Sequence, residues 1–259
     1  MLGHNRDEAG IDVDIYPTAN DTFLTYFDRA AAQILGGSIP AGVSLSALIG
    51  LNKLTPSTPF PGLPPAIFDT THPPAPEIIF NATMHFFTDA LFTCYTFAKT
   101  YSAARHAAWK SAHYFEFNRS YQPAGYTRTW CEPPKDDPKG EYYKCHAGEQ
   151  LVVFGNAVRA GLPDRDGLDV KFMQLVVDYW ATFARNGDPN PERGWLEARG
   201  YEGTLGEMER VGKWEAVEVG GEKGPTMRVL QWGGRQVGLG EGHNEVCKGL
   251  GIPLDVLEP

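Results

Sequence analysis

The sequence lacks the features that mark several broad classes of protein. No apolar run approaches the roughly 20 residues that a membrane-spanning helix needs. The 259 residues include 23 lysines and arginines against 32 acidic residues, which gives a net charge of −9. No basic cluster offers a footprint for nucleic-acid phosphates. We therefore expect neither a membrane span nor a nucleic-acid partner.

Signals for a nucleotide cofactor and for export are also missing. The glycine-rich stretches at 233–234 and 238–242 do not stand between a strand and a helix with dinucleotide-binding spacing, so they are interpreted as turns. We expect no cofactor. The N-terminus carries His4, Arg6, Asp7 and Glu8 and has no apolar segment of the kind found in signal peptides.

What is present indicates a folded α/β chain. Hydrophobic residues make up 42% and aromatic residues 12% of the sequence, enough for a substantial core. No internal repeat or clear linker divides the chain, so residues 1–259 are treated as a portion of one domain. Eight prolines between positions 55 and 76 predict an irregular segment.

Apolar spacing predicts the main elements. Residues 1–10 read as the end of a strand followed by a turn. Helices are expected where apolar residues recur every three or four positions, and strands where short aromatic or β-branched runs occur. The expected helices are 21–35, ended by Gly36-Gly37, one or two within 77–110, and 166–186, capped by Asp166 or Asp169 and stopped by Gly187; the expected strands are 111–117 and 227–232, with a long loop at 118–144.

A carboxylate and a distant histidine are the most informative pair. Glu8 stands in Gly3-His4-Asn5-Arg6-Asp7-Glu8-Ala9-Gly10, and His146 opens the stretch HAGEQLVVFG. Acid first and histidine later is the order in which α/β-hydrolases present the last two members of a Ser–Asp/Glu–His triad. The nucleophile should precede both on a Gly-x-Ser-x-Gly turn, and the sequence contains no such pentapeptide.

The other histidines fit less well. His85, His106 and His113 lie inside expected regular elements, where a packing role is favoured. His4, His72 and His243 lie near the termini or in the proline-rich segment. His146 instead follows the strand and loop, where a triad histidine belongs. Glu149 is too close to it in sequence to face the ring edge and is interpreted as a local structural carboxylate.

Three blocks of this sequence resemble the type-B carboxylesterase and cholinesterase family. The segment around Glu8 is similar to its G-x-N-x-D-E-G stretch, with Ala9 in place of the last glycine. The segment at His146 is similar to its H-x-x-E-x-x-x-V-F-G stretch. Residues 175–191, LVVDYWATFARNGDPNP, resemble its W-x-x-F-A-x-x-G-x-P-N helix end. The loop 121–145, with its Cys-x-Pro-Pro, is closest in character to fungal members.

The resemblance implies a fold and a reaction. The fold would be the C-terminal portion of an α/β-hydrolase, a mixed sheet flanked by helices, without the N-terminal half that carries the nucleophile turn. Glu8 and His146 would be the triad acid and base for hydrolysis of a small-molecule carboxylic ester, and the chain alone is expected to be inactive. The alternative is a non-catalytic adhesion or interaction domain, since some members keep the fold and lose the triad.

The four cysteines allow two interpretations. Cys131 and Cys145 cluster with His146, but zinc sites usually pair their thiolates as Cys-x2-4-Cys, and these two are 14 apart with no second pair. A Cys131–Cys145 disulfide is favoured over a metal, and no metal is expected there. Cys94 and Cys247 are then left to pair, which resembles a bridge known in the family; free buried thiols are the alternative.

Sequons and an even cysteine count favour an oxidising, glycosylating compartment. Asn20, Asn81 and Asn118 each begin an Asn-x-Ser/Thr sequon. We therefore expect a secreted, glycosylated parent protein whose signal peptide lies outside this sequence.

Overall fold

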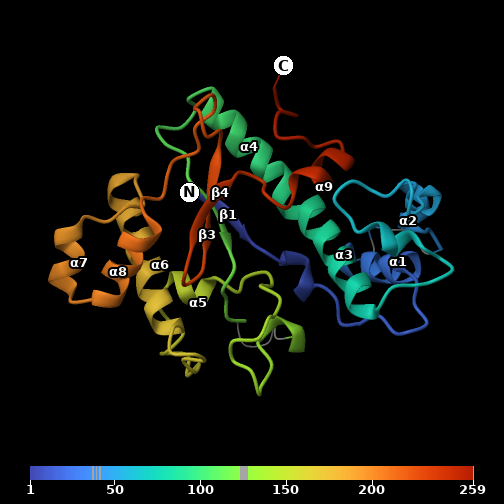
Figure 1. Ribbon diagram of the computed structural model, residues 1–259, viewed down its shortest axis with the longest axis horizontal. Helices are drawn as coiled ribbons and strands as arrows, with labels where there is room; N and C mark the ends of the chain where they lie inside the picture. Colours follow the sequence, from blue (N-terminus) through green and yellow to red (C-terminus); the bar gives the residue numbers. More distant parts are fainter. Residues whose placement is uncertain (37, 39, 41, 123–127, 259) are drawn as a thin grey trace.

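The computed structural model describes residues 1–36, 38, 40, 42–122 and 128–258, and a four-stranded mixed sheet lies at its centre (Figure 1). Strands β1 (Leu2–Asn5), β2 (Tyr114–Phe117) and β3 (Thr226–Leu230) are parallel, and β4 (Arg235–Gly238) is antiparallel to β3. The strands lie in chain order. Because parallel neighbours need long crossover connections, helices cover both faces. The predicted α/β class with a mixed sheet is confirmed.

The side chains of β2 alternate between the two faces of the sheet. Tyr114 packs on Phe97 with ring centroids 4.8 Å apart, and Glu116 points to the same side. Phe115 and Phe117 point to the other side, where each ring packs on Trp180. This period of two is what a strand between two helical layers requires.

One long helix covers the first face. It consists of α3 (Pro76–Thr88), a π-helical turn (Asp89–Thr93) and α4 (Cys94–Arg105) without a break. The predicted region 77–110 therefore holds one continuous helix, which ends at Arg105, and not two packed ones. Pro76 occupies the first turn, where its missing N–H costs nothing. Inside the π turn, Thr93 Oγ1 donates to Asp89 Oδ1 at 2.6 Å. Such turns are rare and are common at functional sites.

Helix α6 (Asp169–Asn186) covers the second face. It starts three residues later than predicted, and neither Asp166 nor Asp169 is its N-cap, because Leu168 holds that position. Asp164 instead accepts from the Asp169 backbone N–H at 2.9 Å. Gly187 ends the helix as predicted, with φ at 75°, a conformation that glycine adopts without strain.

A separate helical layer lies beyond α3. Helix α1 (Phe23–Ile34) falls within the predicted range 21–35 and is capped by Thr22. The sequence predicted that Gly36-Gly37 ends this helix, and Gly37 lies outside the described residues. The Phe27 and Phe87 rings stack at 4.8 Å between α1 and α3. The proline-rich segment between residues 55 and 76 is irregular, as predicted, and holds the 3-10 turn Pro65–Phe68 before α3 begins. Two short elements precede it, α2 (Leu45–Leu48) and the 3-10 turn Leu51–Lys53.

The glycine-rich C-terminal part holds more structure than the sequence indicated. Residues 194–242 were expected to give one strand, but they also form helices and β4. Helices α7 and α8 pack beside α6, and α9 lies against α4 (Figure 1). The additional elements are α5 (Gln150–Val153), α7 (Arg193–Arg199), α8 (Glu202–Val211) and α9 (Asn244–Gly249). No helix among the described residues is long and apolar enough to cross a membrane.

Candidate active site

The site lies where β1 and β2 end. These strands are parallel and pair in register from Leu2–Tyr114 to Asn5–Phe117, so both release the chain at the same edge. The backbone continues the pairing beyond the strands, because the Arg6 N–H donates to the Phe117 carbonyl at 3.1 Å. Carboxyl ends of parallel strands are the usual place for a functional site in α/β proteins. The segments that carry Glu8 and His146 both start from this edge.

Glu8 begins a 3-10 turn (Glu8–Ile11) directly after β1 and is buried. Its Oε1 accepts from the Asn5 backbone N–H at 2.6 Å, and its Oε2 pairs with His146 Nδ1 at 2.7 Å. Both carboxylate oxygens are therefore used, one to fix the turn and one to hold the imidazole. The structure brings together the two residues that the sequence order had paired.

His146 lies in a turn between β2 and α5. Its side chain is 53% exposed and packs on the Phe92 ring with centroids 5.3 Å apart. The hydrogen bond that Glu8 accepts from the ring raises the pKa of His146 above its usual range. With Nδ1 occupied by Glu8, no hydrogen bond to Nε2 is found among the described residues. The arrangement leaves one ring nitrogen free to exchange a proton with a nucleophile.

The turn that carries His146 is fixed from three sides. Cys145 is bridged to Cys131, with Cα atoms 5.7 Å apart. The Tyr121 backbone N–H donates to the Gly148 carbonyl at 2.8 Å. A Cβ at Gly148 would lie 2.8 Å from Ser120 Cβ, so only glycine fits this close approach. Part of the long loop before it, including Pro123 and Gly125, lies outside the described residues.

The local role expected for Glu149 agrees with its contacts. Its carboxylate accepts from the Asn5 side-chain amide, and no contact with the His146 ring edge is found among the described residues. Asn5 thus joins the two acids, since its backbone binds Glu8 and its side chain binds Glu149.

Comparison with protein families matches residues 67–231, well over half of the sequence, to a family described as "Carboxylesterase family". The chain belongs to the carboxylesterase family. Among solved structures it is similar to one called PNB esterase, with a TM-score of 0.46 and 18% sequence identity. That match covers 91% of this chain and 34% of the other, so the chain spans about a third of that esterase's length. The search of curated proteins gave no match.

The disulfides of this carboxylesterase-family chain are the two expected pairs. Besides Cys131–Cys145, Cys94 at the start of α4 is bridged to Cys247 in α9, with Cα atoms 5.4 Å apart. All four cysteines are used, so Cys131 and Cys145 do not form a thiolate metal site with His146.

The three sequons lie in different surroundings. Asn20 lies exposed before α1, and Asn81 is an exposed position within α3. Asn118 is half-buried, and its amide is bound on both sides, since it accepts from Arg6 at 2.8 Å and donates to Gln231. Attaching a sugar to Asn118 would break these bonds, so Asn20 offers the most accessible of the three sites.

Three of the other histidines differ from the sequence interpretation, and one of them is His4, which was set aside as near the N-terminus but is buried on β1. His113 has the expected packing role and is buried beside Trp214. His106 does not, because its side chain is 55% exposed at the end of α4 and pairs with Glu258 at 2.8 Å. His243, set aside as near the C-terminus, is buried.

A buried polar cluster around His243 is the feature that sequence reasoning missed. His243 Nδ1 pairs with Asp89 at 2.6 Å and Nε2 with Glu116 at 3.0 Å. Burial alone would lower the pKa of His243, but these two carboxylates outweigh it and raise the pKa to about 10. The signal was available in the sequence: Glu116 stands within the aromatic strand Tyr-Phe-Glu-Phe and Asp89 within an apolar helix, and buried carboxylates need partners.

Proposed function

We propose that this chain is the C-terminal portion of a carboxylic-ester hydrolase and supplies the acid and the histidine of a Ser–Glu–His triad. The bond between Glu8 Oε2 and His146 Nδ1 at 2.7 Å is the observation that carries the proposal. The substrate is a small-molecule carboxylic ester, in keeping with the carboxylesterase family.

The roles follow from the chemistry of acyl transfer. His146 Nε2 takes the proton of the serine hydroxyl as the serine attacks the ester carbonyl, and it then returns the proton to the departing alcohol. Glu8 holds the imidazole in the tautomer that leaves Nε2 free to accept. Its negative charge also stabilises the imidazolium, which agrees in direction with the raised pKa of His146.

The serine is proposed to come from a polypeptide segment outside this sequence. The sequence contains no Gly-x-Ser-x-Gly turn, and among the described residues no serine hydrogen-bonds His146. Loss of a triad nucleophile costs about a millionfold in rate. The 259-residue chain alone is therefore proposed to be inactive.

Reconstitution tests these roles. The 259-residue chain is assayed with p-nitrophenyl esters and a fluorophosphonate probe, alone and joined to the coding sequence upstream of it in the gene. Turnover and labelling are expected only in the joined protein, with the label on an upstream serine. His146→Ala should abolish turnover, and His106→Ala, which changes an exposed histidine, should not. Label on a serine within this sequence would refute the assignment.

The alternative, a non-catalytic adhesion or interaction domain, predicts a different result. A joined protein that carries an upstream Gly-x-Ser-x-Gly, folds normally and still neither turns over esters nor binds the probe would support it. The paired Glu8 and His146 favour the enzyme, because a domain that has lost catalysis has no need to keep this pair.

Secretion is part of the same proposal. Two disulfides and three sequons suit an oxidising compartment. Mass analysis of the natively expressed protein, before and after glycosidase treatment, tests this, with Asn20 the expected sugar carrier.

A further inference from the structure

Three buried side chains from distant parts of the sequence converge on one point beside the sheet. His4 lies on β1, Glu116 is its register partner on β2, and His243 precedes α9. All three residues are at least nine-tenths buried. The atoms through which they could bind a metal ion lie within 4.8 Å of one another. Because β1 and β2 are parallel and in register, His4 and Glu116 must face the same side.

Both imidazoles are anchored through the nitrogen that points away from this point. His243 Nδ1 pairs with the Asp89 carboxylate at 2.6 Å, and His4 Nδ1 pairs with the Tyr114 hydroxyl at 3.0 Å. Each ring therefore directs Nε2 inward. An outer partner that fixes the ring and tautomer of a histidine is the usual second contact of a metal ligand, and a carboxylate in that role raises the ligand's basicity.

The Glu116 carboxylate stands from both imidazoles at distances close to those between the ligands of a tetrahedral ion. Glu116 Oε2 lies 3.0 Å from His243 Nε2 and 3.5 Å from His4 Nε2. Ligands at 2.0–2.1 Å from zinc in a tetrahedron stand about 3.3 Å apart. His4 Nε2 is buried, and its contact with Glu116 Oε2 at 3.5 Å is an ion-pair distance that makes no hydrogen bond. A buried nitrogen without a hydrogen bond is costly unless something binds it more closely.

We propose that His4, Glu116 and His243 form a binding site for a divalent zinc ion, separate from the Glu8–His146 pair. Two imidazoles and one carboxylate are ligands typical of zinc, whereas magnesium and calcium prefer oxygen alone. In the structure the His243 ring bridges the Asp89 and Glu116 carboxylates. A zinc ion between the three ligands would keep the Asp89 contact and bind His4 Nε2 more closely than Glu116 does at 3.5 Å.

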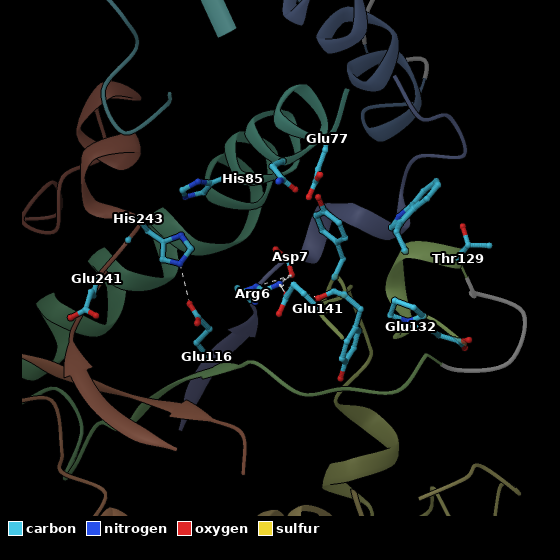
Figure 2. A pocket seen from close by; sticks show the side chains of 16 residues that line it. Arg6, Asp7, Glu77, His85, Glu116, Thr129, Glu132, Glu141, Glu241 and His243 are labelled. Carbon is cyan, nitrogen blue, oxygen red and sulfur yellow. Dashed lines mark hydrogen bonds and ion pairs between the residues drawn. The ribbon is translucent and has the colours of Figure 1, made fainter. Parts of the chain in front are cut away.

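Two of the three proposed ligands line a cavity. Glu116 and His243 line a hollow of about 840 Å³ together with His85 and Glu241 (Figure 2). Figure 2 shows the His243 ring directed at the Glu116 carboxylate at the end of this hollow. Three protein ligands with one open position is the pattern of zinc sites that hold a water or a small ligand. The cavity gives the ion a path from solvent.

Two other groups of candidate ligands are less suited to an ion. His85, Asp89 and His243 also lie close together, but Asp89 is already held by His85 at 3.0 Å, by His243 and by Thr93. Asp164, Asp166 and Asp169 also lie close together, but they are all carboxylates. Asp166 and Asp169 are already bound by the Arg119 guanidinium. Their charge is compensated, so no cation is needed there.

Zinc retention by the untagged 259-residue chain tests the site. The chain is stripped with a chelator, reloaded with zinc chloride, desalted and analysed by mass spectrometry for metal. About one zinc per chain is expected. His4→Gln, Glu116→Gln and His243→Gln should each abolish retention. Asp89→Asn, which keeps the shape of the outer partner and leaves all three ligands in place, should weaken binding by about 10- to 100-fold.

Two controls keep the outcome decisive. His106→Gln removes an exposed histidine–carboxylate pair and should leave retention unchanged, and the four bridged cysteines cannot supply thiolates. If a ligand variant does not fold, cobalt added to the unaltered chain still reports, because four-coordinate cobalt gives strong visible absorption. No retained zinc and no such absorption, or equal retention by all three variants, would overturn the proposal. Neither readout depends on esterase activity.

Discussion

The Asp169 carboxylate offers the sharpest test of what holds the His146 turn in place. It is buried at the start of α6 and accepts hydrogen bonds from three residues. Arg165 binds it through Nε and Nη2, each at 2.8 Å, and Arg119 Nε donates at 2.7 Å. The Tyr121 hydroxyl donates at 2.6 Å, and the Tyr121 backbone binds the Gly148 carbonyl in the His146 turn. Asp169 is thus two contacts away from the turn that carries His146.

Asp169→Asn keeps the shape and removes the charge. The side chain of Asp169 is 3% exposed, and those of Arg119 and Arg165 are 15% and 10% exposed, so the two guanidinium groups would lose a desolvated partner. Breaking a buried ion pair typically costs about 3–5 kcal/mol. Urea unfolding followed by fluorescence measures this loss. Glu197→Gln is the matched control: its pair with Arg193 is exposed on both sides, and such pairs contribute about 0–1 kcal/mol.

The pH dependence has a definite sign. Burial would raise the pKa of Asp169, but the bonds from Arg165 and Tyr121 outweigh it and hold the pKa well below its usual range. A carboxyl whose folded pKa is depressed contributes stability that is complete above its unfolded pKa of about 3.9 and is lost as pH falls below that value. The unaltered chain should therefore lose more stability between pH 5 and 3 than Asp169→Asn does. If Asp169→Asn costs less than about 1 kcal/mol, the pair is not a desolvated one and the reasoning fails.

Three further predictions follow from the remaining contacts. Glu8→Gln should lower the pKa of His146 in an NMR titration, because the bond from Glu8 raises it; an unchanged pKa would contradict the pairing. Burial lowers the pKa of His113 to about 4, so NMR should show a neutral ring at pH 5. Between about pH 6.5 and 4 the unfolded chain takes up a proton at this histidine and the folded chain does not, so His113 should reduce the stability of the fold as pH falls through that range. Replacing Cys94 and Cys247 by alanine opens a loop of sequence separation 153, and calorimetry should show a loss near 5 kcal/mol in the chain-entropy model; a loss below about 1 would indicate a constrained unfolded state.

The parts of the fold that the sequence predicted are those whose signal is local. Helix α6 repeats its apolar residues every three and four positions and ends at a glycine, and both were visible in the sequence. Helices α7 and α8 were missed because glycines interrupt them: Gly194, Gly203 and Gly206 lie within helical residues. Packing beside α6 offsets their low propensity, and such tertiary support cannot be read from a local window.

The residues of the two sites also differ in how far they could be predicted from local sequence. Glu8 and His146 could be paired from sequence because each follows a strand, and parallel strands end at one edge. The zinc ligands could not be assembled, because His4, Glu116 and His243 converge only once the register of β1 on β2 and the path of the C-terminal segment are known. A lone carboxylate in an aromatic strand predicts a buried partner, but it does not identify the residue that provides this partner.

The two sites depend on the same strand pairing. A strand places alternate side chains on opposite faces, so a slip of one residue between β1 and β2 would turn His4 away from Glu116. The same slip would shift Glu8 by about 3.3 Å relative to the segment that leads to His146, more than a hydrogen bond tolerates. Gly3 resists such a slip, because the Phe115 side chain lies 2.3 Å from where its Cβ would stand, and only a glycine can occupy the place beside that ring. The register that Gly3 fixes is therefore the common requirement of the Glu8–His146 pair and of the proposed metal site.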